Sequence, residues 1–472
     1  MAIGRLLLNA NIKLLSPLLI GSGNDDYSDI DAILDEYNQP FIPATSFVGV
    51  LAHHLKEENF QYSEQDREFL EKLFGYSKKV NGQHESWQSK LYCSDLNLVD
   101  SAHLTTRDGI RIDSKTNIIK PKGKFDFQTV DAGAEFRLKL EAEYKDESFR
   151  LFVLRIFQTI ISELTCHNDE KLGYEIPIRI GAKTNNGLGR VTIENHEISD
   201  YSFSKIDDVI AWLGGGKAPV KEDLVQTPYG KLNTDFVIDG YFDLKTSVIM
   251  RAYSSDPSAP DASHIKSAGK NILTGTGVKG VIRARARRIL FTLFGYDNPR
   301  AEEIFSKLFG YVDEDSESDV KAAKSRIQIE ETVLPAYPEE LHTRIKIDRF
   351  TGGTIKAALF DTMPLFSSDI DTDKEAIRVI MKIENFDDHE AGLLLLILKD
   401  LWTMDLPVGG EKGIGRGVLE GIGAKIIIKD DEINIGKDIA QLTEEEKIKL
   451  SDLVVKLNNL VKSEEVSNAT II

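Results

Sequence analysis

Residues 41–55 read FIPATSFVGVLAHHL and residues 272–290 read ILTGTGVKGVIRARARRIL, so a short turn of small and hydroxyl residues opens a helix twice. Three further pairs keep the same order in both halves of the chain: Asp31-Ala32 with Asp261-Ala262, IRID (110–113) with IKID (345–348), and GLGR (187–190) with GIGR (413–416). Ordered matches at a nearly constant offset predict a tandem duplication.

Each half shows the same order of predicted elements. An apolar strand precedes the turn and helix, and strand-like segments, a basic arm, a further strand, an apolar helix and a glycine-rich loop follow. This order is the split βαβ plan. We therefore expect an α+β protein of two tandem ferredoxin-like (RRM-like, βαββαβ) domains with inserted β-hairpin arms. A sheet of this kind can keep one face free, which RNA-recognition domains use.

The duplication sets the predicted boundaries: a first domain at 1–205, a linker at 206–234, a second domain at 235–430, and a C-terminal amphipathic helix with a tail at 431–472. Residues 212–230 carry Gly, Pro and charge without periodicity, which is typical of a linker. Thr443 and Glu446 have the spacing of a capping box before the last helix.

Composition places the chain among soluble globular proteins, with 41% hydrophobic and 28% charged residues. The longest apolar run, Leu393–Leu398, is far shorter than the roughly 20 residues that span a bilayer. Asn9, Asn11 and Lys13 interrupt the apolar residues at 1–23, so we expect a strand there and not an export signal. Two cysteines, Cys93 and Cys166, make no disulfide framework. We expect a cytoplasmic protein with no membrane partner.

The net charge of −18 argues at first against a nucleic-acid partner, because phosphate contacts need Lys and Arg. The charge is segregated, however. Residues 262–290 contain seven basic side chains and no acid, and 111–124 and 344–356 are also mainly basic. Since the local field decides binding, an RNA partner stays open.

The turns, arms and glycine loops supply the candidate RNA contacts. Amide groups at a helix N-terminus favour phosphate, although plain helix capping explains the hydroxyl residues equally well. A solvated helix face is likewise the alternative for the basic run, and a tight turn is the alternative for each glycine loop. Because the turn recurs in both halves we prefer RNA, and the candidates are Ser46, Gly277, Lys279, Arg283, Arg349, Arg190 and Arg416.

The loops before the two turns are the candidate sites of chemistry. The first holds Asp25, Asp26, Asp29 and Asp31, and the second holds Asp256 and Asp261. One or two carboxylates can suffice for Mg²⁺, which keeps several waters and takes further contacts from substrate phosphate. Loop carboxylates are often only solvated, which is the alternative. The motifs HExxH and GxSxG are absent, and His264 could assist as an acid or base or only pack.

By these residues the chain resembles the RAMP (repeat-associated mysterious protein) backbone subunits of type III CRISPR-Cas effector complexes. The matching features are the loop Asp before each turn, the segment IDRFTGGTIKAALFDT (347–362), and the closing loops NNGLGR (185–190) and GGEKGIGRG (409–417). The first half departs at Ala44, where the family's turn usually has Gly, and its arm, 113–125, lacks an RFTGG segment. Two fused modules are most similar to the fused subunits of subtype D.

The resemblance implies a function. Such subunits stack along a crRNA guide, hairpin thumbs displace nucleotides, and a loop Asp cuts the paired target RNA with a divalent metal. Carried over by position, Asp31 and Asp261 would be the catalytic and metal-binding residues, with Asp26, Asp29 and Asp256 as fallbacks. The implied partners are the guide, the target RNA and other effector subunits. A non-catalytic RNA-binding scaffold is the alternative, and a guide-processing nuclease would need an acid–base pair that we cannot assemble.

Overall fold

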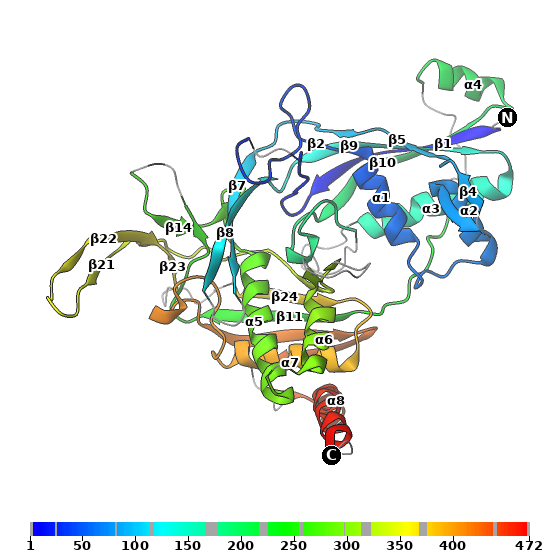
Figure 1. The fold of residues 1–472 in the computed structure, drawn as a ribbon. Helices are drawn as coiled ribbons and strands as arrows, with labels where there is room; N and C mark the ends of the chain where they lie inside the picture. Colours follow the sequence, from blue (N-terminus) through cyan, green and yellow to red (C-terminus); the bar gives the residue numbers. More distant parts are fainter. Residues whose placement is uncertain are drawn as a thin grey trace. The chain divides into compact units, whose positions relative to one another are not determined.

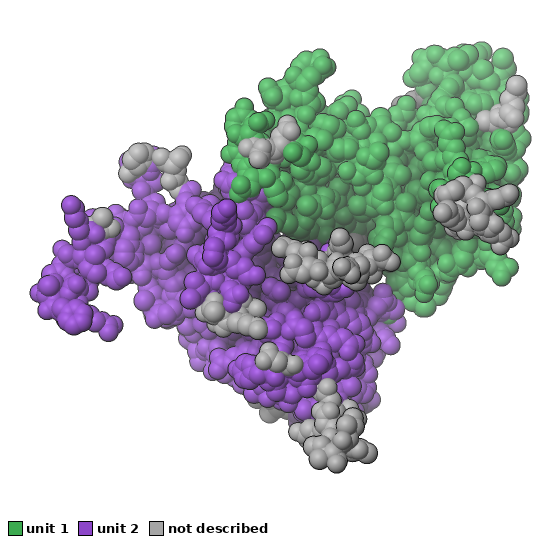
Figure 2. Space-filling view, viewed as in Figure 1, with its two compact units in different colours: residues 1–105, 128–184, 188–233 green, residues 106–127, 185–187, 234–472 purple. Residues whose placement is uncertain are grey.

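The chain forms two compact units in a computed structural model (Figure 2). Unit 1 comprises residues 1–105, 128–184 and 188–233, and unit 2 comprises residues 106–127, 185–187 and 234–472. Unit 2 therefore contains two short segments from the first half of the sequence. The structure describes residues 3–23, 26–80, 83–113, 118–165, 178–216, 225–253, 256, 258–296, 298–312, 322–367, 375–437 and 441–469. Asp25 and Cys166 lie outside these ranges.

Unit 1 is built on a four-stranded antiparallel sheet of order β10-β1-β9-β5 (Figure 1). The strands are β1 (Gly4–Leu14), β5 (Leu91–Cys93), β9 (Glu135–Tyr144) and β10 (Val191–Ser202). Leu6, Leu8 and Ile12 of β1 are fully buried while Asn9 is exposed, so one sheet face meets the core. Helices α1 (Ala44–Leu55) and α3 (Glu147–Leu164) supply the apolar side chains that cover this face.

Unit 2 contains a five-stranded antiparallel sheet of order β19-β24-β11-β25-β26. Its strands are β11 (Phe236–Leu244), β19 (Ile327–Ile329), β24 (Ile377–Ile383), β25 (Leu419–Ile428) and β26 (Asp431–Gly436). Helices α5 (Gly275–Phe294), α6 (Pro299–Phe309) and α7 (Asp388–Trp402) share its hydrophobic core. Strand β26 lies beyond residue 430, where we placed the domain end, because it pairs with β25 along its whole length.

Each half also carries a β-hairpin. The first is β7 (Leu104–Ile112) with β8 (Ile119–Val130), and the second is β21 (His342–Ile347) with β22 (Thr354–Met363). The second hairpin extends away from the body of unit 2 (Figure 1). Its tip is a turn in which the Asp348 carboxylate accepts the amides of Phe350 and Thr351, and Phe350 is 101% exposed. The predicted arm at 344–356 is therefore a hairpin.

The remaining elements are short or peripheral. In unit 1 they are β2 (Phe41–Ile42), α2 (Glu64–Phe74), β3 (Tyr76–Val80), β4 (Gln83–Trp87), β6 (Leu96–Asn97) and α4 (Ile206–Leu213). In unit 2 they are β12 (Ser247–Val248), β13 (Arg251–Ala252), β14 (Ala262–His264), β15 (Lys266–Ser267), β16 (Lys270–Leu273), β17 (Tyr311–Val312), β18 (Ala322–Ala323), β20 (Thr332–Val333), β23 (Leu365–Phe366) and α8 (Glu444–Ala469). The predicted capping box is present at α8, since Thr443 and Glu446 bond reciprocally.

The predicted linker, 206–234, is partly structured. Helix α4 forms at its start because Trp212 packs edge-on against Tyr201, with ring centroids 5.1 Å apart. Near its end Tyr229 is buried, and the Arg155 guanidinium lies 3.8 Å from the centre of its ring. Both anchors are contacts of aromatic rings with the rest of unit 1, which a composition-based reading does not detect.

A buried histidine, His54, lies near the end of this segment within unit 1. The ring of His54 is 2.7 Å from Glu163 Oε2 and 3.2 Å from Glu57 Oε1, and Lys231 forms an ion pair with Glu57. Burial alone would lower the pKa of His54, but the hydrogen bonds to Glu163 and Glu57 outweigh burial and raise it. Together with Lys231, this histidine ties residue 231 to helix α1. Among the described residues, no helix is long and apolar enough to cross a membrane.

Candidate functional site

The carboxylate of Asp31 braces its own loop. One oxygen accepts the amides of Asp26 and Tyr27 at 2.8 and 3.0 Å, and the other accepts the amide and the hydroxyl of Ser28, both at 2.8 Å. The residue is 6% exposed. Burial raises the pKa of this carboxyl, but the hydrogen bonds prevail and hold the pKa below its usual range. In this arrangement both oxygens already have partners.

Asp261 is in a different environment. It is exposed, and its Oδ2 accepts the backbone amide of Asp361 at 2.8 Å, at the base of the hairpin β21–β22. Its Oδ1 has no hydrogen-bond partner among the described residues. Oδ1 of Asp361 itself is a buried oxygen that also lacks one within the described part of the chain. Two carboxylates thus lie at this hairpin base, with oxygens that protein donors leave unused.

Backbone register changes the match between the two acidic loops. Ile33 donates its amide to the carbonyl of Ile20 at 2.9 Å, and Ile265 donates its amide to the carbonyl of Met250 at 2.8 Å. Ile20 and Met250 hold the same place in the two halves, so Ile33 and Ile265 occupy matching positions. The fourth residue before Ile265 is Asp261, and the fourth before Ile33 is Asp29. The Asp-Ala sequence match therefore differs from the structural one, which pairs exposed Asp29, one of the fallbacks, with Asp261.

The other loop candidates have local partners. Asp256 is exposed and accepts the amide and the hydroxyl of Ser258, which lowers its pKa. Asp26 and Asp29 are both exposed. His264 is buried, with Nε2 2.9 Å from the Ile272 carbonyl and Nδ1 accepting the amide of Met250, and burial lowers its pKa. The geometry therefore gives His264 a packing role.

The two helix starts differ in how their amides are used. At α5, Thr274 caps the helix and its hydroxyl accepts the amide of Gly277. At α1, the Asp95 carboxylate accepts the amide of Ala44 at 2.8 Å, and Ser46 is half-buried in the first turn. Both turns thus satisfy part of their own amides, and contact of Ser46 or Gly277 with RNA stays a prediction.

Of the basic candidates on α5, one is engaged and one is exposed. The Lys279 ammonium donates to the carbonyls of Ile327 and Asn185, at 2.9 and 3.3 Å, and burial lowers its pKa to about 7. Arg283 is exposed, and its guanidinium lies 5.2 Å from the centre of the Phe305 ring. Arg283 can therefore reach a ligand, whereas Lys279 joins parts of unit 2.

Arg416 and Glu411 are the buried members of a network in the second glycine loop. Its Nε donates to Glu411 at 2.7 Å and its Nη1 donates to Ser247 at 2.8 Å, while Glu411 also binds Arg344 and Arg251. Burial raises the pKa of Glu411, but the three guanidinium groups outweigh burial and lower it. This network fastens the loop to the base of the hairpin β21–β22.

In the two glycine loops, the residues that correspond in backbone position differ from those that the GLGR and GIGR sequence match pairs. Gly189 and Gly417 correspond, because their amides donate to Pro17 and Ser247 carbonyls at 2.8 and 2.6 Å. Both have positive φ, and a Cβ would lie within 2 Å of a backbone oxygen, 1.9 and 1.7 Å away respectively. Arg416 therefore corresponds to Leu188 and not to Arg190. Arg190 is buried as well, and contact of either arginine with RNA stays a prediction.

Arg349 lies at the exposed tip of the second hairpin, next to Phe350. Lys346 and Lys356 are also exposed on this hairpin, and so are the apolar side chains of Ile345 and Leu359. The first hairpin likewise exposes basic residues, namely Arg111, Lys120, Lys122 and Lys124. Exposed cations interleaved with aromatic and apolar side chains are typical of surfaces that bind single-stranded nucleic acid.

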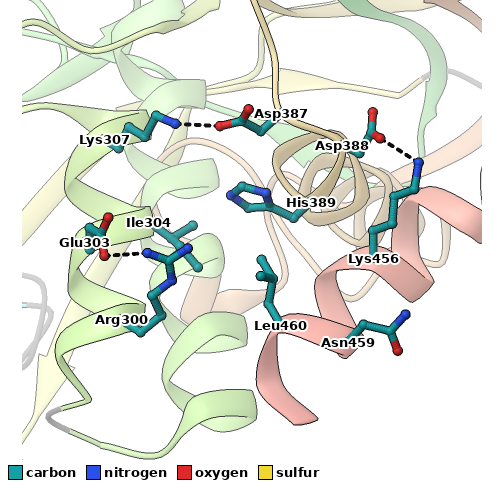
Figure 3. Close-up of a pocket in the computed structure, with 10 residues that line it drawn as sticks. All are labelled: Arg300, Glu303, Ile304, Lys307, Asp387, Asp388, His389, Lys456, Asn459 and Leu460. Atoms are coloured by element: carbon teal, nitrogen blue, oxygen red, sulfur yellow. Dashed lines mark hydrogen bonds and ion pairs between the residues drawn. The ribbon is translucent and has the colours of Figure 1, made fainter. Parts of the chain in front are cut away.

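A pocket between α6, α7 and α8 was not predicted from the sequence. It has a volume of about 510 Å³ and is lined mainly by charged side chains. Lys307 pairs with Asp387 and Lys456 pairs with Asp388 across it, while Arg300 pairs with Glu303 along α6 (Figure 3). Asp387, His389 and Glu390 lie close enough to hold a metal ion. Glu390, however, binds Arg326 and the amide of Asp387, so these carboxylates serve as helix and ion-pair partners.

Comparison with known proteins identifies the family. The RAMP superfamily model matches residues 11–192 and 233–420, together well over half of the chain. Among curated proteins, none matches the chain significantly. RAMP proteins are CRISPR-associated, bind RNA and work with other subunits. With one matched segment in each half, the chain belongs to the RAMP superfamily and is a tandem RAMP protein.

Proposed function

We propose that this chain is a backbone subunit of a crRNA-guided type III CRISPR effector complex, of the fused kind found in subtype D, and that it cleaves target RNA paired with the guide. The observation that carries the proposal is Asp261. It presents an exposed carboxylate at the base of a basic hairpin, with one oxygen that no described donor uses.

The fold supports an RNA-backbone role. The sheet orders β10-β1-β9-β5 and β19-β24-β11-β25 support a ferredoxin-like module, because in each half the first and third strands of the βαββαβ plan would be the two middle strands. One face of each sheet is covered by helices that share its core. The basic hairpins β7–β8 and β21–β22 would act as thumbs, with Phe350 as the side chain that stacks against a base.

A divalent cation such as Mg²⁺ fits the second acidic loop. Asp261 offers a free oxygen, and Asp361 offers a buried oxygen without a protein partner. When bound, the cation supplies positive charge to the scissile phosphate and lowers the pKa of an attacking hydroxyl. The protein's part is to hold Asp261 in place through the Asp361 amide and to bring the target strand over it.

In the first acidic loop we propose that Asp29 has the role of Asp261, because the two share one position in the backbone register. Asp31 then serves as the brace of the loop. At least one of the four hydrogen bonds of Asp31 would have to break before it could bind a cation, because each of its oxygens already accepts two. If Asp29 is not used, the first module is a scaffold, which is the second candidate function for that half of the chain.

The test is target cleavage by the guide-loaded complex. We compare wild type with Asp261→Asn, and with Asp388→Asn as the matched control, since Asp388 is an exposed carboxylate of the same unit that pairs with Lys456. Native mass measurement checks that every complex assembles. We expect Asp261→Asn to lose one cleavage product and the control to lose none. Unchanged products from an assembled Asp261→Asn complex would refute the catalytic part of the proposal.

A further inference from the structure

The first half of the chain supplies two segments to unit 2, and a specific set of contacts holds them there. Arg107, at the base of the first hairpin, forms a bidentate ion pair with Glu331, with N–O distances of 2.6 and 3.1 Å. The side chains are only 4% and 5% exposed. Lys279 donates to the carbonyl of Asn185, and Asn185 Nδ2 donates to the Ser325 carbonyl. We call this set of contacts the joint.

The joint also needs a glycine. A Cβ at Gly275 would lie 2.1 Å from the carbonyl oxygen of Asn186 and 2.8 Å from that of Ile329. Both atoms are backbone, so neither can swing aside. Any residue larger than glycine at position 275 would push the 185–187 loop off the start of α5.

The second half receives the inserted segments with Gly275, Lys279 and Glu331, which we call the receiving residues. Strand pairing identifies their counterparts in the first half. Ile42 pairs with Leu96 as Leu273 pairs with Thr332, so the residues next in sequence correspond as well. The place of Gly275 is taken by Ala44, that of Lys279 by Val48, and that of Glu331 by Asp95. Asp95 is shorter than Glu331, and its carboxylate is turned onto the amide of Ala44. The receiving face of the first half lacks the features on which the joint depends.

Arg107 and Asn185, which the first half inserts into the joint, also have different residues at their places in the second half. Aligning IRID (110–113) with IKID (345–348) puts His342 of the hairpin β21–β22 in the place of Arg107. His342 contacts Arg416 at 3.3 Å. In the second glycine loop, the short helical turn Lys412–Ile414 corresponds to Thr184–Asn186, so Gly413 stands for Asn185 and has no side-chain amide. The two outer ends of the chain are therefore mismatched with each other.

We propose that these replacements stop the chain from docking on further copies of itself, so that the joint forms once, between its own two halves. Head-to-tail contacts that can repeat produce open filaments, and a chain with two similar modules carries that risk. The exposed outer ends are then left for partners other than this chain. The inference goes beyond the proposed function and does not depend on RNA cleavage.

The first test removes the joint within the full chain. The variant Gly275→Ala/Lys279→Val/Glu331→Asp gives the receiving face of the second half the residues of the first. We expect amide hydrogen exchange at residues 185–187 to become about tenfold faster or more, while exchange in β1 and β9 stays unchanged. If residues 185–187 keep wild-type protection, these three residues do not encode the joint and the proposal fails.

The second test builds a new joint between two chains. One chain carries Ala44→Gly/Val48→Lys/Asp95→Glu and the other carries His342→Arg/Gly413→Asn, and thermal melting confirms that each folds. In sedimentation, wild type and each variant alone should stay at the mass of a single chain. An equimolar mixture of the variants should show a species of twice that mass. Self-association of wild type, or a mixture of folded variants that stays at single-chain mass, would overturn the proposal.

Discussion

Two glycines on helix α5 should respond in opposite directions to the same substitution. Gly280→Ala adds a methyl group with no atom within 4 Å, so only the helix propensity changes. Alanine is more favourable than glycine in a helix interior by about 0.8–1.0 kcal/mol, and we expect stabilisation of this size. Gly275→Ala adds the same methyl group 2.1 Å from the carbonyl oxygen of Asn186.

The cost at Gly275 follows from that distance. Real Cβ atoms do not approach other atoms within 3.0 Å, so the loop 185–187 or the start of α5 must move. Overpacking of this kind costs about 1–3 kcal/mol, which equals or exceeds the gain in helix propensity. We therefore expect a net loss of about 0–2 kcal/mol for Gly275→Ala, and a difference of about 1–3 kcal/mol between the two variants.

The assay is hydrogen exchange of peptides from α5 and from residues 185–187, because a chain of two units has no single unfolding free energy. Thermal melting of each variant gives a second reading, with about 2–4 °C expected per kcal/mol for a unit of this size. If Gly275→Ala were as stabilising as Gly280→Ala, the close approach of Asn186 would not exist in solution, and the joint would lose its main steric argument.

Three further predictions concern other parts of the chain. Wild type should have a stability contribution from His54 that is complete below pH 6.5 and is lost as the pH rises through the raised pKa of the histidine. Replacing His54 by Gln should remove this contribution, measured as urea midpoints between pH 5 and 8. Parallel pH curves for wild type and variant would contradict the prediction. Arg107→Met should cost about 3–5 kcal/mol because it leaves Glu331 buried and unpaired, and adding Glu331→Gln should recover part of the loss; additive losses would contradict the ion pair. Phe350→Ala should weaken guide binding by about 1–3 kcal/mol in a filter assay, with unchanged melting; equal affinity would argue against stacking at the hairpin tip.

The duplication and the order of elements could be predicted from the sequence, because hydrophobic periodicity and recurring turns are local signals. Boundaries were less accurate. The apolar segment 11–20 marks the first strand too late in the sequence, because β1 runs from Gly4 to Leu14. Leu6, Leu7 and Leu8 are all buried, and Pro17 follows the strand. The strand β26 was missed because its acidic start, KDDE, is typical of a turn.

The roles of the basic side chains could not be predicted, because their partners are distant in sequence. Lys279 and Arg416 have the charge and the motif position of phosphate ligands, yet their donors meet Asn185 and Ser247. The sequence does not show that Arg107 is buried, because its partner, Glu331, is distant in sequence and is identified only by the fold. The acidic loops show the same limit, since two carboxylates within three positions, Asp29 and Asp31, can be told apart only by backbone register.

The most direct test of the account is a map of target cleavage products from guide-loaded complexes that carry Asp29→Asn, Asp31→Asn or Asp261→Asn, each assembled to the wild-type mass and supplied with Mg²⁺. We predict that Asp29→Asn and Asp261→Asn each abolish a different cut and leave the other at its wild-type rate. If the Asp29→Asn complex and the Asp261→Asn complex each still formed every product, this result would contradict the assignment of catalysis to these loops.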